Sequence, residues 1–333
     1  MAHTAAVSRT SVGSTLRPME NHHASATRRV DGRNSQPRTF PCTVARGRQT
    51  CRPKGAAMKG EVAGPTAREP VWCAPELTFR VVPGLPRIQP GDDISVALIR
   101  ALERQCWALH DHDVIVVTSK IISKAEDRFV DLAKVVPSPR ARALAQATDS
   151  DPRVVEVVLW DTEKVSRCTK GALIVRHHAG HVSANAGLDQ SNVHPSSAPA
   201  GTGPWVLRLP ANPDASAGVL RERLERRFGV RVGVLVSDSF GRPFRLGTVG
   251  VAIGASGLPP LYDQRGRSDL HGRKLEHTLT ATGDQLCAAA DLVCGQADEG
   301  RPAVLVRGLR FESPEPSLGA STLCRATDED LYL

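Results

Sequence analysis

Several features that define common protein classes are scarce in this sequence. Aromatic residues make up only 4% of the 333 residues, and no stretch approaches the roughly 18 consecutive apolar residues of a membrane-spanning helix. We therefore expect a protein that is not embedded in a membrane. The eight cysteines form no C-x-x-C motif, and no cysteine–histidine pair has zinc-finger spacing. We expect them to be reduced and mostly buried, in a cytoplasmic protein.

The common nucleotide and hydrolase motifs are also missing. The chain has no G-x-x-x-x-G-K-[ST] loop and no G-x-G-x-x-G behind a strand, which argues against P-loop and Rossmann folds. It has no G-x-S-x-G elbow and no H-E-x-x-H motif. An enzyme with this sequence uses a less common scaffold.

Positive charge is abundant, but it is confined to one end. The formal net charge is +8, yet residues 1–60 hold eleven Lys/Arg and only two Asp/Glu. The rest of the chain holds 32 basic and 33 acidic residues. A polyanion-binding surface on the folded body is therefore not expected, and we predict no nucleic-acid partner.

The N-terminal segment has the composition of a disordered extension. Residues 1–70 are rich in Ser, Thr, Arg, Gly and Pro and show no apolar periodicity. They contain no apolar core of a secretory signal, but an organellar transit peptide and translation from Met58 both stay open. We predict a folded domain over residues 71–320 and a C-terminal tail over 321–333.

Strands and helices alternate irregularly in the folded part. Apolar or alternating runs predict strands at about 77–82, 113–118, 172–176, 181–184, 230–236 and 303–306. Caps and amphipathic spacing predict helices after Gly91-Asp92-Asp93, over 137–147, from Asp151, over 214–229 and, the longest, over 271–293. Residues 190–210 have the composition of a long loop. The absence of a regular βαβ period favours a mixed α+β fold.

The first polar cluster spans Ser119–Glu126 and follows the apolar run that ends at Thr118. Ligands of mixed sheets meet polar groups at strand ends. Lys120 and Lys124, with nearby hydroxyls, suit a phosphate chain. The alternative is a solvated turn with an ordinary Lys–Glu pair.

The second cluster is Asn185–Asn192, a small-residue turn that carries Asp189, three amides and a hydroxyl. Magnesium and manganese prefer such oxygen ligands, with phosphate and water filling the remaining positions. Ordinary turn chemistry explains the same residues and remains the alternative.

The third cluster, Ser237–Arg245, follows the apolar run 230–236. Asp238 at the end of a buried strand is placed to bind a metal, with Ser239 as a second oxygen ligand. Arg242 and Arg245 suit a phosphate or carboxylate. The alternative is that Asp238 only caps a turn.

Two further segments have competing interpretations. His177, His178 and His181 have a spacing that zinc can use, but they straddle a predicted turn without a matching Cys or carboxylate. Residues 294–300 are typical of a helix end with a glycine cap and solvated acids.

The order of these clusters along the chain is more specific than any one of them. From about Phe79 to Leu309 the sequence closely resembles the coenzyme F420-0:L-glutamate ligase family. The segments that carry the resemblance are Val82–Pro86, Gly91–Asp93, Ser119-Lys120, Lys124–Glu126, Asn185–Asn192, Asp238–Pro243, Gly250–Gly254, Asp269–Arg273 and Val306–Leu309.

The resemblance implies a GTP-dependent amide ligase that adds L-glutamate to the lactyl end of the deazaflavin coenzyme F420-0. It implies phosphorylation of the lactyl carboxylate, displacement of phosphate by the glutamate amine, and further γ-linked additions. It also implies a divalent metal (Mn²⁺ or Mg²⁺), K⁺, and an intertwined, two-lobed homodimer with a fold different from ATP-grasp.

The resemblance also implies roles for individual residues. Asp189 and Asp238 match metal-ligand positions central to catalysis, and Ser239 and Gln296 match ligands of a second metal. The positions matching nucleotide contacts are Leu85, Pro86, Arg87, Ile88, Ser119, Lys120, Lys124, Asn192, Cys294, Gly295 and Gln296, the last three within a matching stretch 294–301.

Three departures from the family pattern concern substrate detail. Ser239 stands where threonine is usual, Asp127 replaces a usual glycine, and Ala179 with His181 replaces a usual His-Gly-Phe pattern. A related ligase for another carboxylate acceptor is therefore the main alternative, and a basic-tailed nucleic-acid-binding protein is a more distant one.

Overall fold

The computed structural model describes residues 76–195, 198–199, 201–314 and 316–329. Contacts divide the chain after Ala63, and every described residue belongs to the second of the two units. The predicted extension 1–70 and the last four residues of the predicted tail lie outside the described residues.

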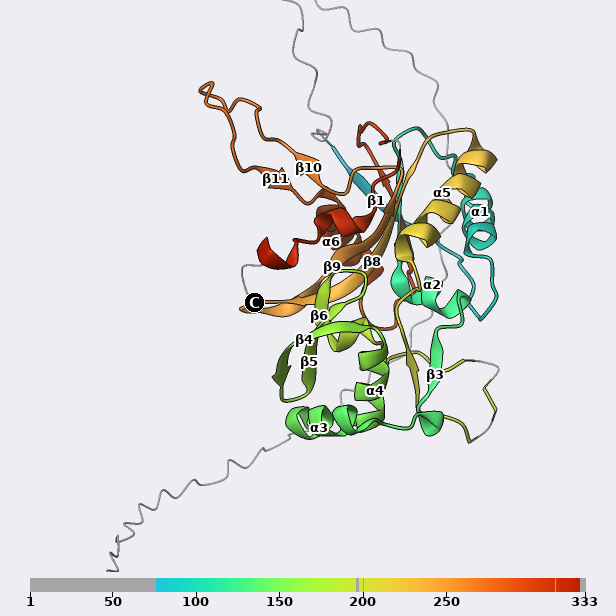
Figure 1. The fold of residues 1–333 in the computed structure, drawn as a ribbon. Helices are drawn as coiled ribbons and strands as arrows, with labels where there is room; N and C mark the ends of the chain where they lie inside the picture. Colours follow the sequence, from blue (N-terminus) through green and yellow to red (C-terminus); the bar gives the residue numbers. More distant parts are fainter. Residues whose placement is uncertain (1–75, 196–197, 200, 315, 330–333) are drawn as a thin grey trace, which may run out of the picture. The chain divides into compact units, whose positions relative to one another are not determined.

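A five-stranded sheet forms the centre of the described chain (Figure 1). Its order is β1 (Thr78–Val81), β12 (Ala303–Arg307), β2 (Val114–Thr118), β8 (Gly233–Arg242) and β9 (Arg245–Ser256). Only β2 and β8 pair in parallel, with Thr118 opposite Ser237, and the other neighbours are antiparallel. A single parallel pair in an antiparallel sheet confirms the mixed α+β class.

Helices cover both faces of this sheet. Ile115 and Val117 point into a cluster with α1 (Ile94–Arg104) and α5 (Pro213–Phe228). Their neighbours Val114 and Val116 point into a second cluster with α6 (Thr282–Cys294). This alternation is the period of a strand buried on both faces. In Figure 1, α1 and α5 lie together on one side of the sheet and α6 on the other.

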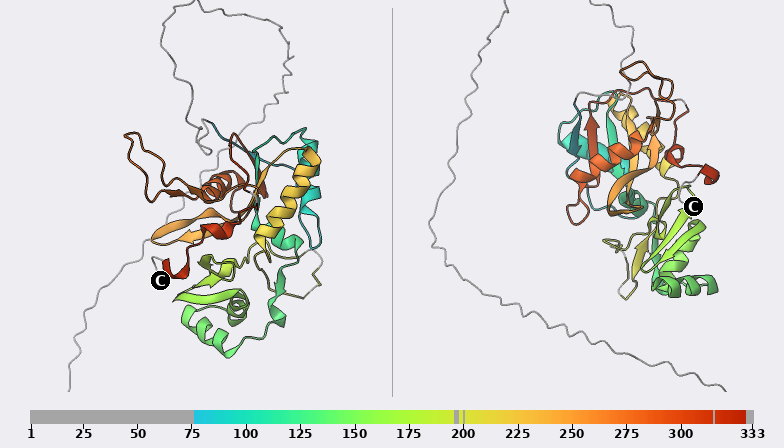
Figure 2. Two further views of the ribbon diagram at one scale, coloured as in Figure 1. Left: turned by 45° about the horizontal axis from the view of Figure 1, so that its top comes forward. Right: turned by 90° about the vertical axis from the view of Figure 1, so that its left-hand side faces the viewer.

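A second group of elements lies within residues 129–207, which we call the small-sheet region. The remaining described residues form the large-sheet region. The sheet of the small-sheet region has the order β4 (Thr162–Thr169), β5 (Ala172–His177), β6 (Val182–Ala184). Helices α3 (Pro139–Thr148) and α4 (Pro152–Trp160) pack on it, and β3 (Phe129–Asp131) pairs with β7 (Trp205–Leu207). Figure 2 shows α3, α4 and the sheet β4–β5–β6 gathered in the green part of the ribbon.

The remaining elements are short. They are α2 (Ser119–Ala125), the two-residue strands β10 (Tyr262–Asp263) and β11 (Leu279–Thr280), and 3-10 turns at Leu132–Lys134, Asn185–Gly187, Ala320–Leu323 and Thr327–Glu329. Within the predicted tail, Leu323 packs against the α6 cluster, which also includes the neighbouring Ala320. No described helix has the length and apolar character to cross a membrane.

Capping residues explain why most helix predictions are correct. The side chain of Asp93 accepts a hydrogen bond from the Val96 amide and starts α1. Proline at the first turn follows the caps of α3, α4 and α5, where its missing N–H costs nothing.

Three predictions are wrong in part. The helix expected over 271–293 begins only at Thr282, because the Asp269 carboxylate accepts from the amides of His271 and Arg273 and forms a turn there. The loop expected over 190–210 contains β7. Asp238 lies inside β8, which continues to Arg242 as a hairpin with β9, and not at the strand's end.

The structure also corrects the cysteine prediction. The five described cysteines form no disulfide, but only Cys287 and Cys294 are buried, whereas Cys106 and Cys168 are exposed. Strand β4 escaped prediction because bulges interrupt its alternation.

Candidate functional site

A cavity of about 760 Å³ opens where the parallel strands β2 and β8 end their pairing. All fourteen residues to which the family resemblance gives a metal or nucleotide role line it, although their individual roles remain predictions. They are Leu85, Pro86, Arg87, Ile88, Ser119, Lys120, Lys124, Asp189, Asn192, Asp238, Ser239, Cys294, Gly295 and Gln296. Arg242 and Arg245, at the end of the β8–β9 hairpin, are not among the lining residues.

Asp238 is held at the wall of the cavity by the sheet. It follows Ser237, the last β8 residue to pair with β2, so its side chain projects just beyond the end of β2. The chain turns there from β2 into α2, and the Ser119 hydroxyl donates a 2.9 Å hydrogen bond to Asp238 Oδ1.

The environment of Asp238 disfavours its ionised form. Burial raises the pKa of Asp238 to about 6, and the negative charge of Asp189 acts in the same direction. Hydrogen bonds from Ser119 and from the Ser239 backbone act against this shift but do not cancel it. A carboxylate of this kind favours a positive partner in the cavity.

Asp189 reaches the cavity through an unusual turn. Asn185, Ala186 and Gly187 all have positive φ, of 51°, 54° and 69°. A Cβ at Gly187 would lie 2.7 Å from a methyl carbon of Leu209, so glycine is required by both its φ and its packing. The turn is tied to β5, because the Asn185 side chain accepts a hydrogen bond from the Leu173 amide.

Hydrogen bonds then fix Asp189 itself. Its backbone N–H and C=O both pair with Leu207 of β7 at 2.9 Å. Its Oδ1 accepts from the amide and hydroxyl of Ser191, and its Oδ2 lies 2.8 Å from Lys120 Nζ. The two interpretations of this segment, an ordinary turn and an acidic site, are therefore compatible, because the turn holds Asp189 at the cavity.

The two lysines of α2 both line the cavity, but their contacts and surroundings differ. Lys120 also donates to the Ser191 carbonyl and hydroxyl, so it joins α2 to the Asp189 turn. Burial lowers the pKa of Lys124, as does the charge of Lys120, while Asp189 opposes the shift. The Lys–Glu pair considered as an alternative is not what the geometry favours, because Glu126 accepts from Ala211 and Ser216.

The two remaining wall segments come from opposite ends of the folded chain. The loop 85–88 is anchored by Ile88, which is buried in the α1–α5 cluster, and by Arg104, which donates to the Gly84 carbonyl at 2.6 Å. The segment 294–301 follows α6, and the Asn192 side chain donates to the Ala297 carbonyl at 3.4 Å. Segments more than 200 residues apart therefore meet at one cavity.

The oxygen donors suit a hard divalent cation. Asp189 and Asp238 face one cavity with a hydroxyl (Ser239) and an amide (Gln296) on its wall. The charge of Asp189 contributes to the raised pKa of Asp238, and a cation bound between the two carboxylates would relieve this repulsion. The described residues contain no group of three or more His, Cys, Asp or Glu arranged to hold a metal. Two carboxylates with neutral oxygen donors beside them fit an ion that takes further ligands from phosphate and water.

Comparison with known proteins gives this cavity a family context. Residues 84–308 match the family of F420-0:gamma-glutamyl ligases. The chain belongs to this family. The match includes every residue that the sequence analysis selected for the site.

Curated relatives of the ligase family agree. The coenzyme F420:L-glutamate ligase of Methanopyrus kandleri is 44% identical over 263 residues, which is 78% of this chain and 98% of that protein. The enzymes of that name from Archaeoglobus fulgidus (42% identical over 250 residues, 75% of this chain and 94% of that protein) and Methanothermobacter thermautotrophicus (40% over 251, 75% and 96%) are also similar.

The histidine cluster does not have the geometry of a zinc site. The rings of His177 and His181 stack with centroids 4.7 Å apart, and His177 Nδ1 accepts a hydrogen bond from the Ala179 amide. Burial lowers the pKa of His181 to about 3, so this ring stays neutral. These contacts are those of a packed turn between β5 and β6.

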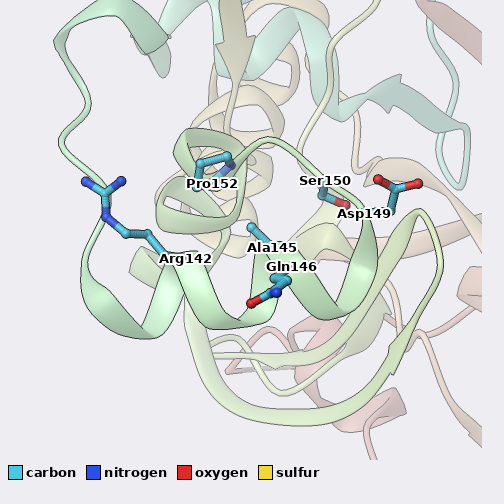
Figure 3. Close-up of a pocket in the computed structure, with 6 residues that line it drawn as sticks. All are labelled: Arg142, Ala145, Gln146, Asp149, Ser150 and Pro152. Atoms are coloured by element: carbon cyan, nitrogen blue, oxygen red, sulfur yellow. The ribbon is translucent and has the colours of Figure 1, made fainter.

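A second hollow lies on the surface of α3 and its connection to α4 (Figure 3). It measures about 450 Å³ and is lined by Arg142, Ala145, Gln146, Asp149, Ser150 and Pro152. In Figure 3 the Arg142 and Asp149 side chains lie at opposite ends of the labelled group and do not converge. It shares no lining residue with the main cavity.

Sequence reasoning missed four polar or aromatic residues of the cavity wall: Gln89, Phe129, His194 and Asp291. Phe129 and His194 lie beside segments that were selected. Asp291 lies inside α6, where the amphipathic pattern gave it the appearance of an ordinary surface acid.

Proposed function

We propose that this protein is a GTP-dependent ligase that adds L-glutamate, through γ-linkages after the first addition, to coenzyme F420-0. The observation that carries the proposal is that fourteen residues, selected from distant parts of the sequence, line one cavity. Membership of the ligase family and the names of the curated relatives support the same acceptor and amino acid.

The size and lining of the cavity suit a nucleotide and the end of an acceptor. Its volume of about 760 Å³ lies within the range of small-molecule sites. The loop 85–88 offers apolar contacts for a base, and Lys120 and Lys124 offer positive charge for phosphates.

The proposed reaction has two steps. A carboxylate oxygen of the acceptor attacks the γ-phosphorus of GTP, the bond to the β-phosphate oxygen breaks, and GDP leaves. The glutamate amine then attacks the acyl carbon, the C–O bond to phosphate breaks, and inorganic phosphate leaves as the nitrogen loses a proton. The acyl phosphate is needed because a free carboxylate is a poor electrophile.

Residues of this chain supply charge and orientation for both steps. Lys120 and Lys124 neutralise phosphate oxygens, and Lys120 exchanges its partner Asp189 for them. Asp189 and Asp238 would hold one divalent cation, and Ser239 and Gln296 would be ligands of a second. When bound, Mn²⁺ or Mg²⁺ stabilises negative charge on the transferred phosphate.

The proposal includes K⁺ and a homodimer. Several large apolar side chains are almost fully exposed, among them Phe244 at 94% and Leu246 at 98% on the β8–β9 hairpin. Such exposure is costly in a monomer and suits a subunit interface. Light scattering after size exclusion tests this, and a monomer at micromolar concentration would contradict it.

The decisive experiment is ligation by the purified protein with F420-0, L-glutamate, GTP and Mn²⁺, followed by mass spectrometry. We expect mass increases in glutamate units with release of GDP, and much weaker turnover when ATP replaces GTP. Omitting K⁺ should slow the reaction. GTP binding without glutamate addition would contradict F420-0 as the acceptor and favour another carboxylate.

A further inference from the structure

Asp291 lines the cavity but has no role in the proposed function. It lies in the last turns of α6, and its Oδ1 accepts a hydrogen bond from the side-chain nitrogen of Gln296. The same carboxylate accepts from the backbone N–H of Gly250 on β9. It thus connects three parts of the wall: a helix, a strand and the loop that follows the helix.

The strand position is significant because Gly250 lies opposite Ser239 in the β8–β9 register. Helix α6 approaches β9 so closely there that a Cβ at Gly250 would lie 2.5 Å from the Cys287 carbonyl oxygen. Asp291 therefore accepts hydrogen bonds from Gln296 and from Gly250, and Gly250 is the residue opposite Ser239 in the β8–β9 register. Ser239 and Gln296 are the two neutral cation ligands of the proposed function.

The hydrogen bond to Asp291 also decides which end of the Gln296 amide is available. A glutamine amide has a donor end and an acceptor end, whereas a carboxylate oxygen accepts. The amide nitrogen must face Asp291, so the carbonyl oxygen is the end left for a cation. Gln296 is otherwise exposed and has three rotatable side-chain bonds, whose freedom would cost binding free energy if it were not restricted beforehand.

Helix stability alone does not explain an acid at this place. The C-terminal end of a helix carries partial negative charge, so an aspartate there is unfavourable. Asp291 is also half-buried, and this burial raises its pKa. A carboxylate with these costs is better explained by the groups that it orients.

We propose that Asp291 is a positioning residue that holds the carbonyl oxygen of Gln296 toward a divalent cation beside Asp238. The inference rests on the proposed function and deepens it. It assigns no direct contact between Asp291 and the cation or substrate.

Asp284 provides a matched control on the same helix. It lies seven residues before Asp291, two turns away, and is also partly buried with a raised pKa. Its Oδ1 accepts from the Ala252 amide of β9 at 2.9 Å, as Asp291 accepts from Gly250. It does not line the cavity. Asp284→Asn therefore removes a partly buried negative charge from the same helix, keeps an oxygen that can accept from the Ala252 amide, and leaves Gln296 untouched.

The experiment is a Mn²⁺ titration of the full-length protein in the presence of GDP, with free Mn²⁺ measured by electron paramagnetic resonance. We expect Asp291→Asn to weaken Mn²⁺ binding by roughly 10- to 100-fold, the range of outer-shell changes at metal sites, and Asp284→Asn to leave it nearly unchanged. In ligation, Asp291→Asn should raise the Mn²⁺ concentration for half-maximal rate more than it lowers the rate at saturating Mn²⁺.

Two further variants keep the proposal testable if Asp291→Asn folds poorly. Gln296→Met leaves the α6–β9 contact intact and should weaken Mn²⁺ binding equally. The double variant Asp291→Asn with Gln296→Glu should regain affinity, because the new amide donates to one carboxylate oxygen and leaves the other for the cation. Equal Mn²⁺ affinities for wild type, Asp291→Asn and Gln296→Met would overturn the positioning role alone. A wild-type protein that binds GDP but no Mn²⁺ would overturn the cation assignment of the proposed function as well.

Discussion

The large-sheet and small-sheet regions differ in how completely their strands leave water. In β2, Val114 to Val117 are at most 2% exposed, whereas no residue of β4 is buried. The clusters on the two faces of the large sheet contain 21 and 15 buried residues, while those of the small-sheet region contain seven and four. Four buried polar atoms of the small-sheet region, those of Ser166, His181, Ser183 and Trp205, have no hydrogen-bond partner in the described chain.

This difference explains why the two aspartates of the cavity are unlike each other. Asp238 comes from the large sheet, where apolar packing desolvates it and raises its pKa. Asp189 comes from a turn of the small-sheet region, where Ser191 and Lys120 can reach it. The large sheet supplies a carboxylate whose pKa is raised by burial, and the small-sheet region supplies one that is paired with Lys120. The following predictions test that contrast, from the largest effect to the smallest.

Asp238→Asn should abolish ligation while the protein stays folded. Outer-shell changes at metal sites already cost 10- to 100-fold, so loss of a direct ligand should lower turnover by more than about 100-fold. Mass-spectrometric ligation assays at saturating Mn²⁺ measure this. Full activity would show that Asp238 does not hold the cation.

The same variant tests the desolvation of Asp238 through its pH dependence. The pKa of about 6 lies above the ordinary value of 3.8, so ionised Asp238 destabilises the fold above pH 6 and this penalty disappears as the pH falls below about 4. With chelator present, Asp238→Asn should therefore have the higher Tm at pH 7, and the difference should shrink toward pH 4. A difference that is constant with pH would place Asp238 in water.

Core truncations compare the two regions directly. Leu235 lies in the cluster between the large sheet and α6, and Leu173 lies in the smaller cluster under β5; each is at most 1% exposed. Leucine-to-alanine changes cost about 2–5 kcal/mol, and less where the site can collapse. We expect Leu235→Ala near the upper limit and Leu173→Ala near the lower one in urea unfolding. The reverse order would mean that the small-sheet region is the more tightly packed.

Lys120 pairs with Asp189 and thereby joins the large-sheet region to the small-sheet region. Lys120→Met separates its expected contribution to nucleotide binding from its effect on cation binding by Asp189. A charge-assisted hydrogen bond contributes about 1.5–3 kcal/mol, so nucleotide affinity should fall roughly 10- to 100-fold. Mn²⁺ affinity without nucleotide should rise, because Asp189 loses its ammonium partner at 2.8 Å. Calorimetric titrations measure both. Lys134→Met, at an exposed lysine that does not line the cavity, is the control and should change neither affinity.

Removal of residues 1–60 should have the smallest effect. This segment carries all of the excess positive charge but no apolar periodicity. We expect unchanged Tm and turnover, and loss of any weak, salt-dependent RNA binding. A lower Tm would show that the segment packs on the fold, and RNA binding that survives truncation would support the nucleic-acid alternative.

Prediction from the sequence succeeded where one local signal decided the structure. The apolar runs around Val116 and Val234 could only be buried strands, and the caps at Asp93 and Gly229 mark helix ends by their own hydrogen bonds and dihedral angles. It failed over 271–281, where the helical spacing continues but the Asp269 turn competes with it. It also missed β7, whose partners β3 and Asp189 are distant in sequence.

The sequence by itself determined the mixed α+β class, the position of four of the five strands of the large sheet (all but β9) and the order of the polar clusters. These depend on local periodicity, caps and side-chain chemistry, which are all present in the linear chain. Only the tertiary structure decided that Asp238 is desolvated beside Asp189, that Lys120 pairs with Asp189 and not with Glu126, and that Asp291 holds Gln296. Those properties arise from contacts between segments up to about 120 residues apart, and from burial, which no local pattern contains.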